Sequence, residues 1–457
     1  MHISRWGRGL GWLLLAAALW AQPGTAETPP KSLEERLEEL DQKVRILERK
    51  AEIEKDAAAE KAKTAGAATA SAKDGFTLRS PDGAFVVKLR GYVQADGRFF
   101  SDDSARPVAD TFLLRRVRPI VEGTLYKNFD FRIMTDFGAG TATVQDAYLD
   151  ARFHPAFKVR AGKFKEPFGL ERLQSGADLL FVERALPTNL VPNRDVGIQL
   201  HGDLFKGRAS YQLGVFNGVA DGGSSDGDVD DSKDVVARLS FQPFITGTSA
   251  AKNLTFAVAA SSGSPTGTAA APALPSYRTP GQQVFFSYRS DGSVAGTTIA
   301  SGDRRRFSPQ LSYYSGAFGL LAEWVRASQE VTRGAVAAEL DSEAWQVAVS
   351  WVIGGSASFK GASVKNGFDP AGHFWGAFEL KARLSGQEVD AAAFPIFADP
   401  ARSASSAEAW AVGLNWAFNR SVKWLLDYEA TTFERGAAGG GDRPDEKVVI
   451  ARFQVSF

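Results

Sequence analysis

Residues 85–96 read FVVKLRGYVQAD, and this stretch decides the fold because apolar and polar residues alternate along it. The odd-numbered positions are apolar or small, and the even-numbered positions carry Lys88, Arg90, Gln94 and Asp96. Successive side chains of a β-strand point to opposite faces, so a period of two predicts a strand with one apolar and one polar face. The same period returns in residues 129–133, 378–384 and 410–416, far apart in the chain.

The connections between these stretches distinguish a membrane barrel from a soluble β-sandwich, which would alternate in the same way. Alternating segments fill the chain from residue 75 onward and leave no second layer to cover their apolar faces. Short and long connections follow one another, and the long polar ones are residues 102–110, 166–193, 217–233, 262–303, 327–342, 386–406 and 436–446. Short turns at one rim and long loops at the other are typical of outer-membrane β-barrels.

Sixteen strands are predicted, an even number as in bacterial single-chain barrels. They lie near residues 84–100, 111–125, 129–138, 143–153, 157–164, 195–204, 208–217, 234–243, 252–262, 304–314, 318–328, 343–353, 374–386, 407–418, 421–433 and 446–457. This count leaves residues 284–289 inside a long loop and makes residues 354–372 a long connection on the short-turn side. The expected fold is all-β, a sixteen-stranded antiparallel transmembrane barrel preceded by a short helical coiled coil.

The chain ends on an alternating strand in which Phe453, Val455 and Phe457 share one face. A terminal phenylalanine after such a strand is the ending that the barrel-assembly machinery of outer membranes reads. We therefore interpret Phe457 as the assembly signal. Both termini are expected in the periplasm, because an even number of strands returns the chain to its starting side.

Three segments are expected along the chain. Residues 1–26 are predicted to be a secretory signal peptide, with Arg5 and Arg8 at its start, an apolar core, and small residues before the cleavage point. A membrane anchor is the alternative, although the apolar core reaches only about half the ~20 residues of a spanning helix. Residues 27–73 are predicted to be a coiled coil with a linker, and residues 74–457 the barrel.

The segment after the signal peptide has the spacing of a coiled coil. Intervals of four and three separate Leu33, Leu37, Leu40, Val44, Leu47 and Ala51, which is the a/d rhythm of a heptad. Ser32 and Glu35 form a capping box at the start of this helix. An amphipathic helix lying on another surface is the alternative, but a seam only two positions wide favours self-association. The rhythm is lost from residue 57, where fraying helix and then linker are expected.

Several stretches resemble the phosphate-selective porin O and P family. The most specific are residues 159–171, which read VRAGKFKEPFGLE, and residues 376–383, which read GAFELKAR. Shorter matching stretches occur at residues 195–202, 306–310, 319–323 and 413–416 and in the terminal strand. The resemblance thus covers the chain from residue 84 to its end.

The resemblance implies a sixteen-stranded trimeric porin with a constricting loop after the fifth strand, whose subunits pass small solutes and, in the named members, anions. N-terminal coiled-coil extensions occur among similar proteins. We therefore predict an outer-membrane porin of a Gram-negative bacterium, with its coiled coil in the periplasm, through which small hydrophilic solutes and above all anions such as phosphate diffuse passively. A structural barrel tethered through that coil is the alternative.

The constriction is expected in the loop of residues 166–193, the longest connection between early strands. The residues predicted to line the anion path are Arg116, Arg118, Arg160, Lys163, Lys165, Arg172, Arg184 and Arg194. Arginine suits this role because its guanidinium donates to phosphate or carboxylate without losing its proton. Two alternatives remain open. The loop arginines could pair with neighbouring acids at the rim, and Arg116 and Arg118 could pair across strands with acids such as Asp130 or Asp150.

Composition excludes several other functions. The chain has 53 basic and 53 acidic residues, a balance that speaks against a nucleic-acid-binding protein. It has no cysteine and four histidines, none in a recognisable catalytic motif, so no enzyme, metal site or other cofactor is expected. The expected partners are outer-membrane lipid, small anionic solutes, further copies of the chain in a homotrimer, and the barrel-assembly machinery.

Overall fold

The computed structural model describes residues 32–64, 67–71, 75–101, 108–228 and 230–457. It divides into two units, an N-terminal one that ends at Thr64 and a β-domain from Ala65 to Phe457. The expected signal peptide lies outside the described residues. Within those residues, no helix combines the length and the apolar character needed to cross a membrane.

The N-terminal unit is one helix, α1 (Leu33–Thr64), as the heptad spacing predicted. It begins with the predicted capping box. The Glu35 amide donates to the Ser32 hydroxyl (3.2 Å), and the Ser32 amide donates to the Glu35 carboxylate (3.0 Å). The seam leucines are exposed, Leu33 to 81% and Leu37 to 64%, so association through them stays a prediction.

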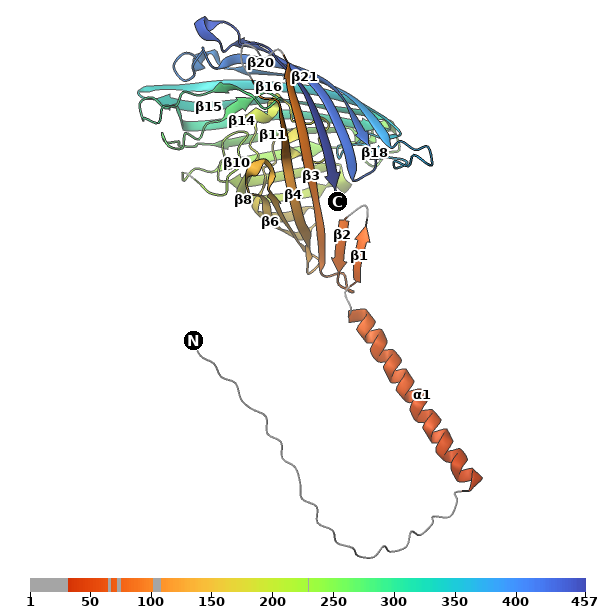
Figure 1. The fold of residues 1–457 in the computed structure, drawn as a ribbon. Coiled ribbons are helices and arrows are strands. Elements are labelled where there is room, and N and C mark those ends of the chain that lie inside the picture. Colours follow the sequence, from red (N-terminus) through yellow and green to blue (C-terminus); the bar gives the residue numbers. More distant parts are fainter. Residues whose placement is uncertain (1–31, 65–66, 72–74, 102–107, 229) are drawn as a thin grey trace, which may run out of the picture. The chain divides into compact units, whose positions relative to one another are not determined.

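Sixteen antiparallel strands close into the predicted barrel (Figure 1). Each strand pairs with the next along the chain, and the last pairs with the first, with Lys447 opposite Ser101 and Ser456 opposite Tyr92. The strands are β3 (Val86–Ser101), β4 (Thr111–Leu125), β5 (Phe129–Asp136), β6 (Thr143–His154), β7 (Phe157–Lys165), β8 (Arg194–Leu204), β9 (Ala209–Phe216), β10 (Asp234–Phe241), β11 (Thr255–Gly263), β14 (Ile299–Ser315), β15 (Phe318–Arg333), β16 (Val336–Ile353), β19 (Ala377–Val389), β20 (Ala404–Ala417), β21 (Val422–Arg435) and β22 (Glu446–Ser456). Closure leaves no unpaired edge, and an unpaired edge would find no hydrogen-bond partner in lipid.

The side chains alternate between a polar interior and an apolar exterior. In β16, Gln346 and Ser350 are buried inside the barrel, whereas Trp345 and Trp351 are 40% and 54% exposed on its outer face. This arrangement is the reverse of a soluble protein and is the one that a lipid-facing wall requires. The two-residue period of the sequence predicted it.

One of the predicted long loops is not a loop in the structure, so that prediction was wrong. Residues 327–342 are the ends of β15 and β16, joined by a turn at Gly334, whose φ of +58° suits glycine. Val331 and Leu340 are buried on the inner face of this hairpin. Its outer face is polar, and there Arg326 donates to Asp341 (2.7 Å), which is why the segment has the composition of a loop.

The linker expected up to residue 73 contains a strand. β1 (Ala67–Ser71) and β2 (Gly75–Arg79) form a hairpin, and β2 pairs with the start of β3, with Phe76 opposite Leu89. The pairing of β22 with β3 reaches only Tyr92, so the hairpin continues the sheet beyond the end of β22. Residues 67–71 read AATAS, and no alternation of apolar and polar residues could reveal this strand.

Two predictions about the connections are confirmed. Residues 284–289 stay out of the barrel wall, since β13 (Val284–Ser287) pairs only with β12 (Ser276–Arg278) in a small separate sheet. Residues 354–372 belong to a long connection between β16 and β19 that contains the hairpin of β17 (Gly355–Ser356) and β18 (Ser363–Val364).

The C-terminal residue is part of the wall. The Phe457 amide donates to the Gly91 carbonyl and the Gly91 amide to the Phe457 carbonyl, each at 3.0 Å. Residue 91 must be small, because a Cβ there would lie 2.8 Å from the Phe457 ring. The terminal ring is therefore held against β3.

We predict that deleting Phe457 removes the protein from the outer membrane of expressing cells but leaves a purified barrel that refolds in detergent. The truncation loses two backbone hydrogen bonds, worth about 0.5–1.5 kcal/mol each, while the rest of the wall remains paired. Cell fractionation measures the first effect, and heat-modifiable gel mobility measures the second. Phe457→Tyr, which keeps a terminal ring, is the control. Normal outer-membrane levels of the truncated protein would contradict the assembly-signal role.

Candidate functional site

The loop of residues 166–193, called the inward loop from here on, leaves β7 and crosses the interior to other parts of the wall. The Leu170 amide donates to the Glu323 carboxylate of β15 (2.6 Å). Farther along, the Val182 amide donates to the Asp427 carboxylate of β21 (2.7 Å). Side chains of the wall thus hold the loop inside the barrel, where the sequence predicted a constriction.

The inward loop also carries its own apolar core. At most 1% of the side-chain surface is exposed at Phe168, Phe181, Leu186 and Leu190. The last two belong to the 3₁₀-helix η2 (Leu186–Leu190) and share one buried cluster with Val331 of β15 and Leu340 of β16. A functional group presented by a loop packed in this way is held in place as it would be on a strand.

Four cations of the wall hold the inward loop by its backbone. They donate to loop carbonyl groups at 2.6–2.9 Å, Lys381 to Leu180, Arg383 to Glu183, Lys423 to Ala177 and Arg452 to Val182. All four come from β19, β21 or β22. These four side chains therefore position the inward loop.

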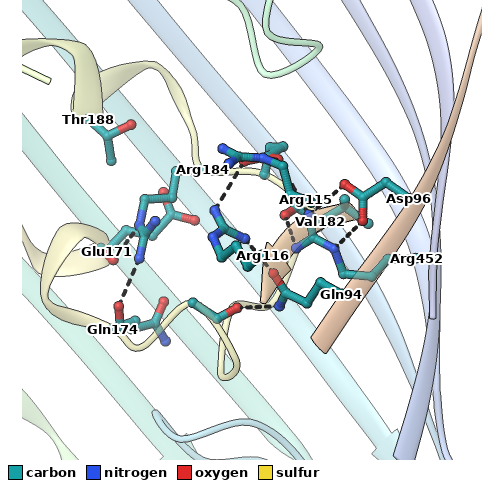
Figure 2. A network of polar contacts seen from close by, with 12 residues as sticks. Gln94, Asp96, Arg115, Arg116, Glu171, Gln174, Val182, Arg184, Thr188 and Arg452 are labelled. Carbon is teal, nitrogen blue, oxygen red and sulfur yellow. Dashed lines mark hydrogen bonds and ion pairs between the residues drawn. The ribbon is translucent and has the colours of Figure 1, made fainter. Parts of the chain in front are cut away.

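Arg115, Arg116 and Arg452 lie close together in Figure 2, and the Glu183 carboxylate joins them in a buried charge network. This carboxylate pairs with Arg115 (2.6 Å), Arg98 (2.9 Å), Arg452 (3.4 Å) and Arg116 (3.5 Å). Asp96 pairs with Arg98 and Arg452 as well. Burial alone would raise the pKa of the Glu183 carboxyl, but Arg115, Arg116 and their neighbours hold it well below its usual range. Four guanidinium groups against two carboxylates leave net positive charge beside the loop.

A β-bulge brings one unexpected arginine into this network. Strict alternation predicts Arg115 on the lipid face, opposite to Arg116. The pairing of β3 with β4 shifts at this point, since Gln94 lies opposite Arg116 but Ala95 lies opposite Leu114. The additional residue turns two consecutive arginines toward the interior. Two adjacent arginines in a predicted strand are the only signal that the sequence offers for it.

Arg172 and Arg184, the predicted arginines of the inward loop, bind backbone groups rather than acids. Arg172 donates to the Thr188 carbonyl (2.6 Å), and Arg184 to the carbonyls of Glu171 (3.2 Å) and Gln174 (2.8 Å), as Figure 2 shows for Arg184. Among the described residues, neither guanidinium has an ion pair with a carboxylate. Burial lowers the pKa of Arg172 to about 9 and that of Arg184 to about 10, so both are charged at neutral pH.

The predicted arginines of the wall, in contrast, have acidic partners. The pairs are Arg118 with Asp136 (2.7 Å), Arg160 with Asp150 (2.6 Å) and Arg194 with Asp146 (2.8 Å), and Arg116 reaches Glu183. Pairing with acids was the alternative for Arg116 and Arg118, but the acids named there bind elsewhere. Asp130 pairs with Arg152, and Asp150 pairs with Arg160.

The two predicted lysines differ in surroundings. Lys163 pairs with Asp226 in the long connection between β9 and β10. Gly162, with a φ of +125°, interrupts the regular strand just before Lys163, which strict alternation does not anticipate. Lys165 donates to the Gln174 carbonyl (2.6 Å) and so lies against the inward loop.

Two cavities lie on opposite sides of the inward loop. The long-loop cavity, of about 640 Å³, is bounded by this loop, by β4 and by parts of the long connections 217–233 and 264–298. The short-turn cavity, of about 340 Å³, is bounded by residues 175 and 177–179 of the loop and by short-turn residues such as Lys360 and Arg420. The inward loop separates the two cavities, at the place where the sequence predicted the constriction.

Positive charge dominates both cavities. The long-loop cavity is lined by Arg115, Arg116, Arg118, Arg172, Arg184, Arg194 and Arg278, against Asp136, Glu183 and Asp221. The short-turn cavity is lined by Arg90, Arg132, Lys360, Arg420 and Lys423, against Asp178 and Glu379. Five predicted site residues thus meet in the first cavity, whereas Arg160, Lys163 and Lys165 line neither. A chain without net charge thus concentrates cations beside the inward loop.

Comparison with known protein families gives one match. The model described as "Phosphate-selective porin O and P" matches residues 87–457, which is nearly the whole barrel. Among curated protein sequences, none matches the chain.

Solved structures of similar fold are outer-membrane proteins. The outer membrane channel DcaP of Acinetobacter baumannii is 11% identical, with a TM-score of 0.53 over 86% of this chain and 100% of that chain. OmpT of Vibrio cholerae in its trimer form is 10% identical, with a TM-score of 0.47 over 82% and 100% of the two chains. Salmonella typhi OmpF in complex with daunomycin is 10% identical, with a TM-score of 0.48 over 81% and 98%. At this identity the likeness to DcaP concerns the fold alone.

We predict that Glu183→Gln destabilises the barrel by about 3–5 kcal/mol, because it leaves buried guanidinium groups without their shared carboxylate. The midpoint of urea unfolding measures the change, and Glu388→Gln on the exposed outer face is the control. Since the Glu183 pKa is depressed in the folded state, its contribution is present above the unfolded-state pKa of about 4.3 and is lost as the pH falls below it. The difference between wild type and Glu183→Gln should therefore be constant from about pH 6 to 8 and shrink in acid. A difference that grows in acid would contradict this role.

Proposed function

Since the chain belongs to the phosphate-selective porin O and P family, we propose that it forms an outer-membrane pore through which small hydrophilic solutes diffuse, with a preference for anions such as phosphate. The family and the barrel are those of outer-membrane channels for small solutes. The preference for anions is our inference, and the lining of the long-loop cavity carries it.

Arg172 and Arg184 supply the strongest argument for this preference. Their bonds to carbonyl groups orient the guanidinium groups without neutralising them. A guanidinium held in this way retains its full charge and further N–H donors for a passing phosphate or carboxylate. Both side chains line the cavity directly beside the constriction, where a charge has most effect on which ions pass.

The paired arginines keep the preference moderate. Arg118 and Arg194 line the same cavity, but Asp136 and Asp146 compensate their charges. Conduction requires that an anion bind well enough to enter and weakly enough to leave. A few uncompensated charges among compensated ones meet both requirements, so we infer a general or mildly anion-selective pore rather than one deep binding site.

The charges that flank the helical seam support a parallel homo-oligomer. With Leu33, Leu40 and Leu47 at heptad position d, the g positions are Arg36, Lys43 and Lys50, and the e positions are Glu34, Asp41 and Glu48. In a parallel coiled coil g faces the next e of the partner, which places Arg36 beside Asp41 and Lys43 beside Glu48 of a second copy. An antiparallel arrangement would bring like charges together. We infer a parallel coiled coil of identical chains, placed in the periplasm.

The height of the wall supports a trimer in which barrels touch. β5, β9 and β10 each have 8 residues, whereas β14 has 17 and β16 has 18. A tilted strand of 8 residues spans about 20 Å, less than the ~25 Å apolar band of a lipid-facing wall. We propose that neighbouring copies cover this low part of the wall, and that three coil strands match three barrels.

We predict that Arg172→Ala with Arg184→Ala lowers the anion-to-cation permeability ratio by about fivefold. A unit charge at ~5 Å in water is worth about 0.8 kcal/mol, salt at about 0.1 M screens this to about 0.5 kcal/mol, and the variant removes two such charges. Reversal potentials in a KCl gradient across a planar bilayer measure the ratio. Arg118→Ala with Asp136→Asn, which removes a charge pair from the same cavity, is the control and should leave the ratio unchanged. A wild-type preference for cations would overturn the proposal, and a barrel without conductance would favour the structural alternative.

We predict that Leu33→Cys cross-links between copies in the oxidised full-length protein. The chain has no native cysteine, and position 33 meets its own copy only in a parallel, in-register coil. Glu38→Cys, at an outward b position, is the control that should remain uncoupled. Deleting residues 27–73 should weaken a trimer that light scattering measures in detergent. Trimeric barrels joined to a coil that cross-links only in antiparallel register would contradict the matched symmetry.

A further inference from the structure

The long connection of residues 264–298, called the outer loop from here on, is packed as firmly as the inward loop. It contains β12 and β13. Phe285 and Phe286 of β13 are both fully buried. Phe286 stacks on Tyr277 with ring centroids 5.1 Å apart, and Phe285 lies 6.1 Å from Phe433 of β21. This aromatic packing fixes the outer loop to the barrel wall.

The alternation of β12 directs one arginine of the outer loop into the long-loop cavity. Tyr277 and Thr279 are buried, whereas Arg278 between them is exposed and lines the cavity. The Arg278 guanidinium donates to the Gln282 carbonyl (3.0 Å) and, among the described residues, has no ion pair with a carboxylate. It therefore has the same character as Arg172 and Arg184, although it comes from a segment about 90 residues away.

Asn189 of the inward loop holds the backbone of Arg278. Its side-chain amide donates to the Arg278 carbonyl (2.9 Å), and its side-chain oxygen accepts from the Arg278 amide (3.1 Å). One side chain thus satisfies both main-chain groups of residue 278, as a neighbouring strand would. The same amide donates to Gln387 of β19 (2.8 Å), which fixes Asn189 itself.

The neighbouring residue, Thr188, holds an arginine of the inward loop by its guanidinium. The Thr188 carbonyl accepts the bond from Arg172, so residues 188 and 189 together position an uncompensated arginine from each loop. We propose that the two loops form a clasp across the long-loop cavity, in which Arg278 is a second selectivity-determining residue for anions and Asn189 is its positioning residue. This inference rests on the proposed anion preference and adds a charge on the outer side of the constriction.

Replacing Arg278 tests the first half of this proposal. Arg278→Ala should lower the anion-to-cation permeability ratio by about two- to threefold, the effect of one charge several ångströms from the ion path. Arg278→Lys keeps the charge and should retain the ratio. Arg326→Ala is the matched control, since Arg326 is exposed, pairs with Asp341 and does not line the cavity.

Replacing Asn189 tests the second half. Asn189→Ala should lower the ratio as much as Arg278→Ala does. The double variant should lower it no further, because both changes remove the same contribution, that of a correctly placed Arg278 charge. Independent, additive changes would show that Asn189 does not act through Arg278. A loss of folding is recognised separately by heat-modifiable mobility.

The outcomes separate this inference from the proposed function. A wild-type pore without anion preference overturns both. An anion-selective wild type whose ratio is unchanged in Arg278→Ala, or falls equally in Arg278→Lys, overturns the clasp alone.

Discussion

Lipid around the wall is the constraint from which the rest of this structure follows. It forces the sheet to close, with β22 on β3, and it favours apolar side chains on the outer face of the strands. The inner face is largely polar, but it also carries apolar residues such as Val331 and Leu340. Leu186 and Leu190 of the inward loop share one buried cluster with them. The inward loop is thus also part of the packing centre of the barrel.

A polar interior must pair its charges or leave them to water, and this barrel does both. Lys381, Arg383 and Arg452 donate to carbonyl groups of the inward loop. These cations of β19 and β22 therefore hold the inward loop in position. Arg118 and Arg194 are compensated by aspartates. Among the described residues, Arg172, Arg184 and Arg278 have no carboxylate partner, and they belong to the inward and outer loops. In the proposed function these arginines act on the ion, whereas the paired ones stabilise the scaffold.

The sequence was sufficient to predict those features that depend on the repeated alternation of apolar and polar residues. A period of two predicted sixteen strands and the polar interior, because each depends on many residues at once. The expectation that residues 166–193 form a constricting loop came from the length of that connection and from the family resemblance. It failed where a single residue breaks the period. The bulge at Arg115 and the positive φ at Gly162 change which face a side chain takes. In the sequence, two adjacent arginines are the only sign of the bulge. The hairpin of β15 and β16 was missed for another reason, because its outer face is as polar as a loop.

The role of each interior arginine could not be predicted from the sequence, and the reason is different. Whether a guanidinium meets a carboxylate or a carbonyl depends on contacts between distant segments, such as Thr188 with Arg172 and Asn189 with Arg278. A carbonyl partner satisfies an N–H group and leaves the charge intact, whereas a carboxylate removes both the free donor and the charge. A chain with 53 basic and 53 acidic residues can therefore still favour one sign of ion. Its composition fixes the sum of the charges, and the folding of two loops determines which of them an ion encounters.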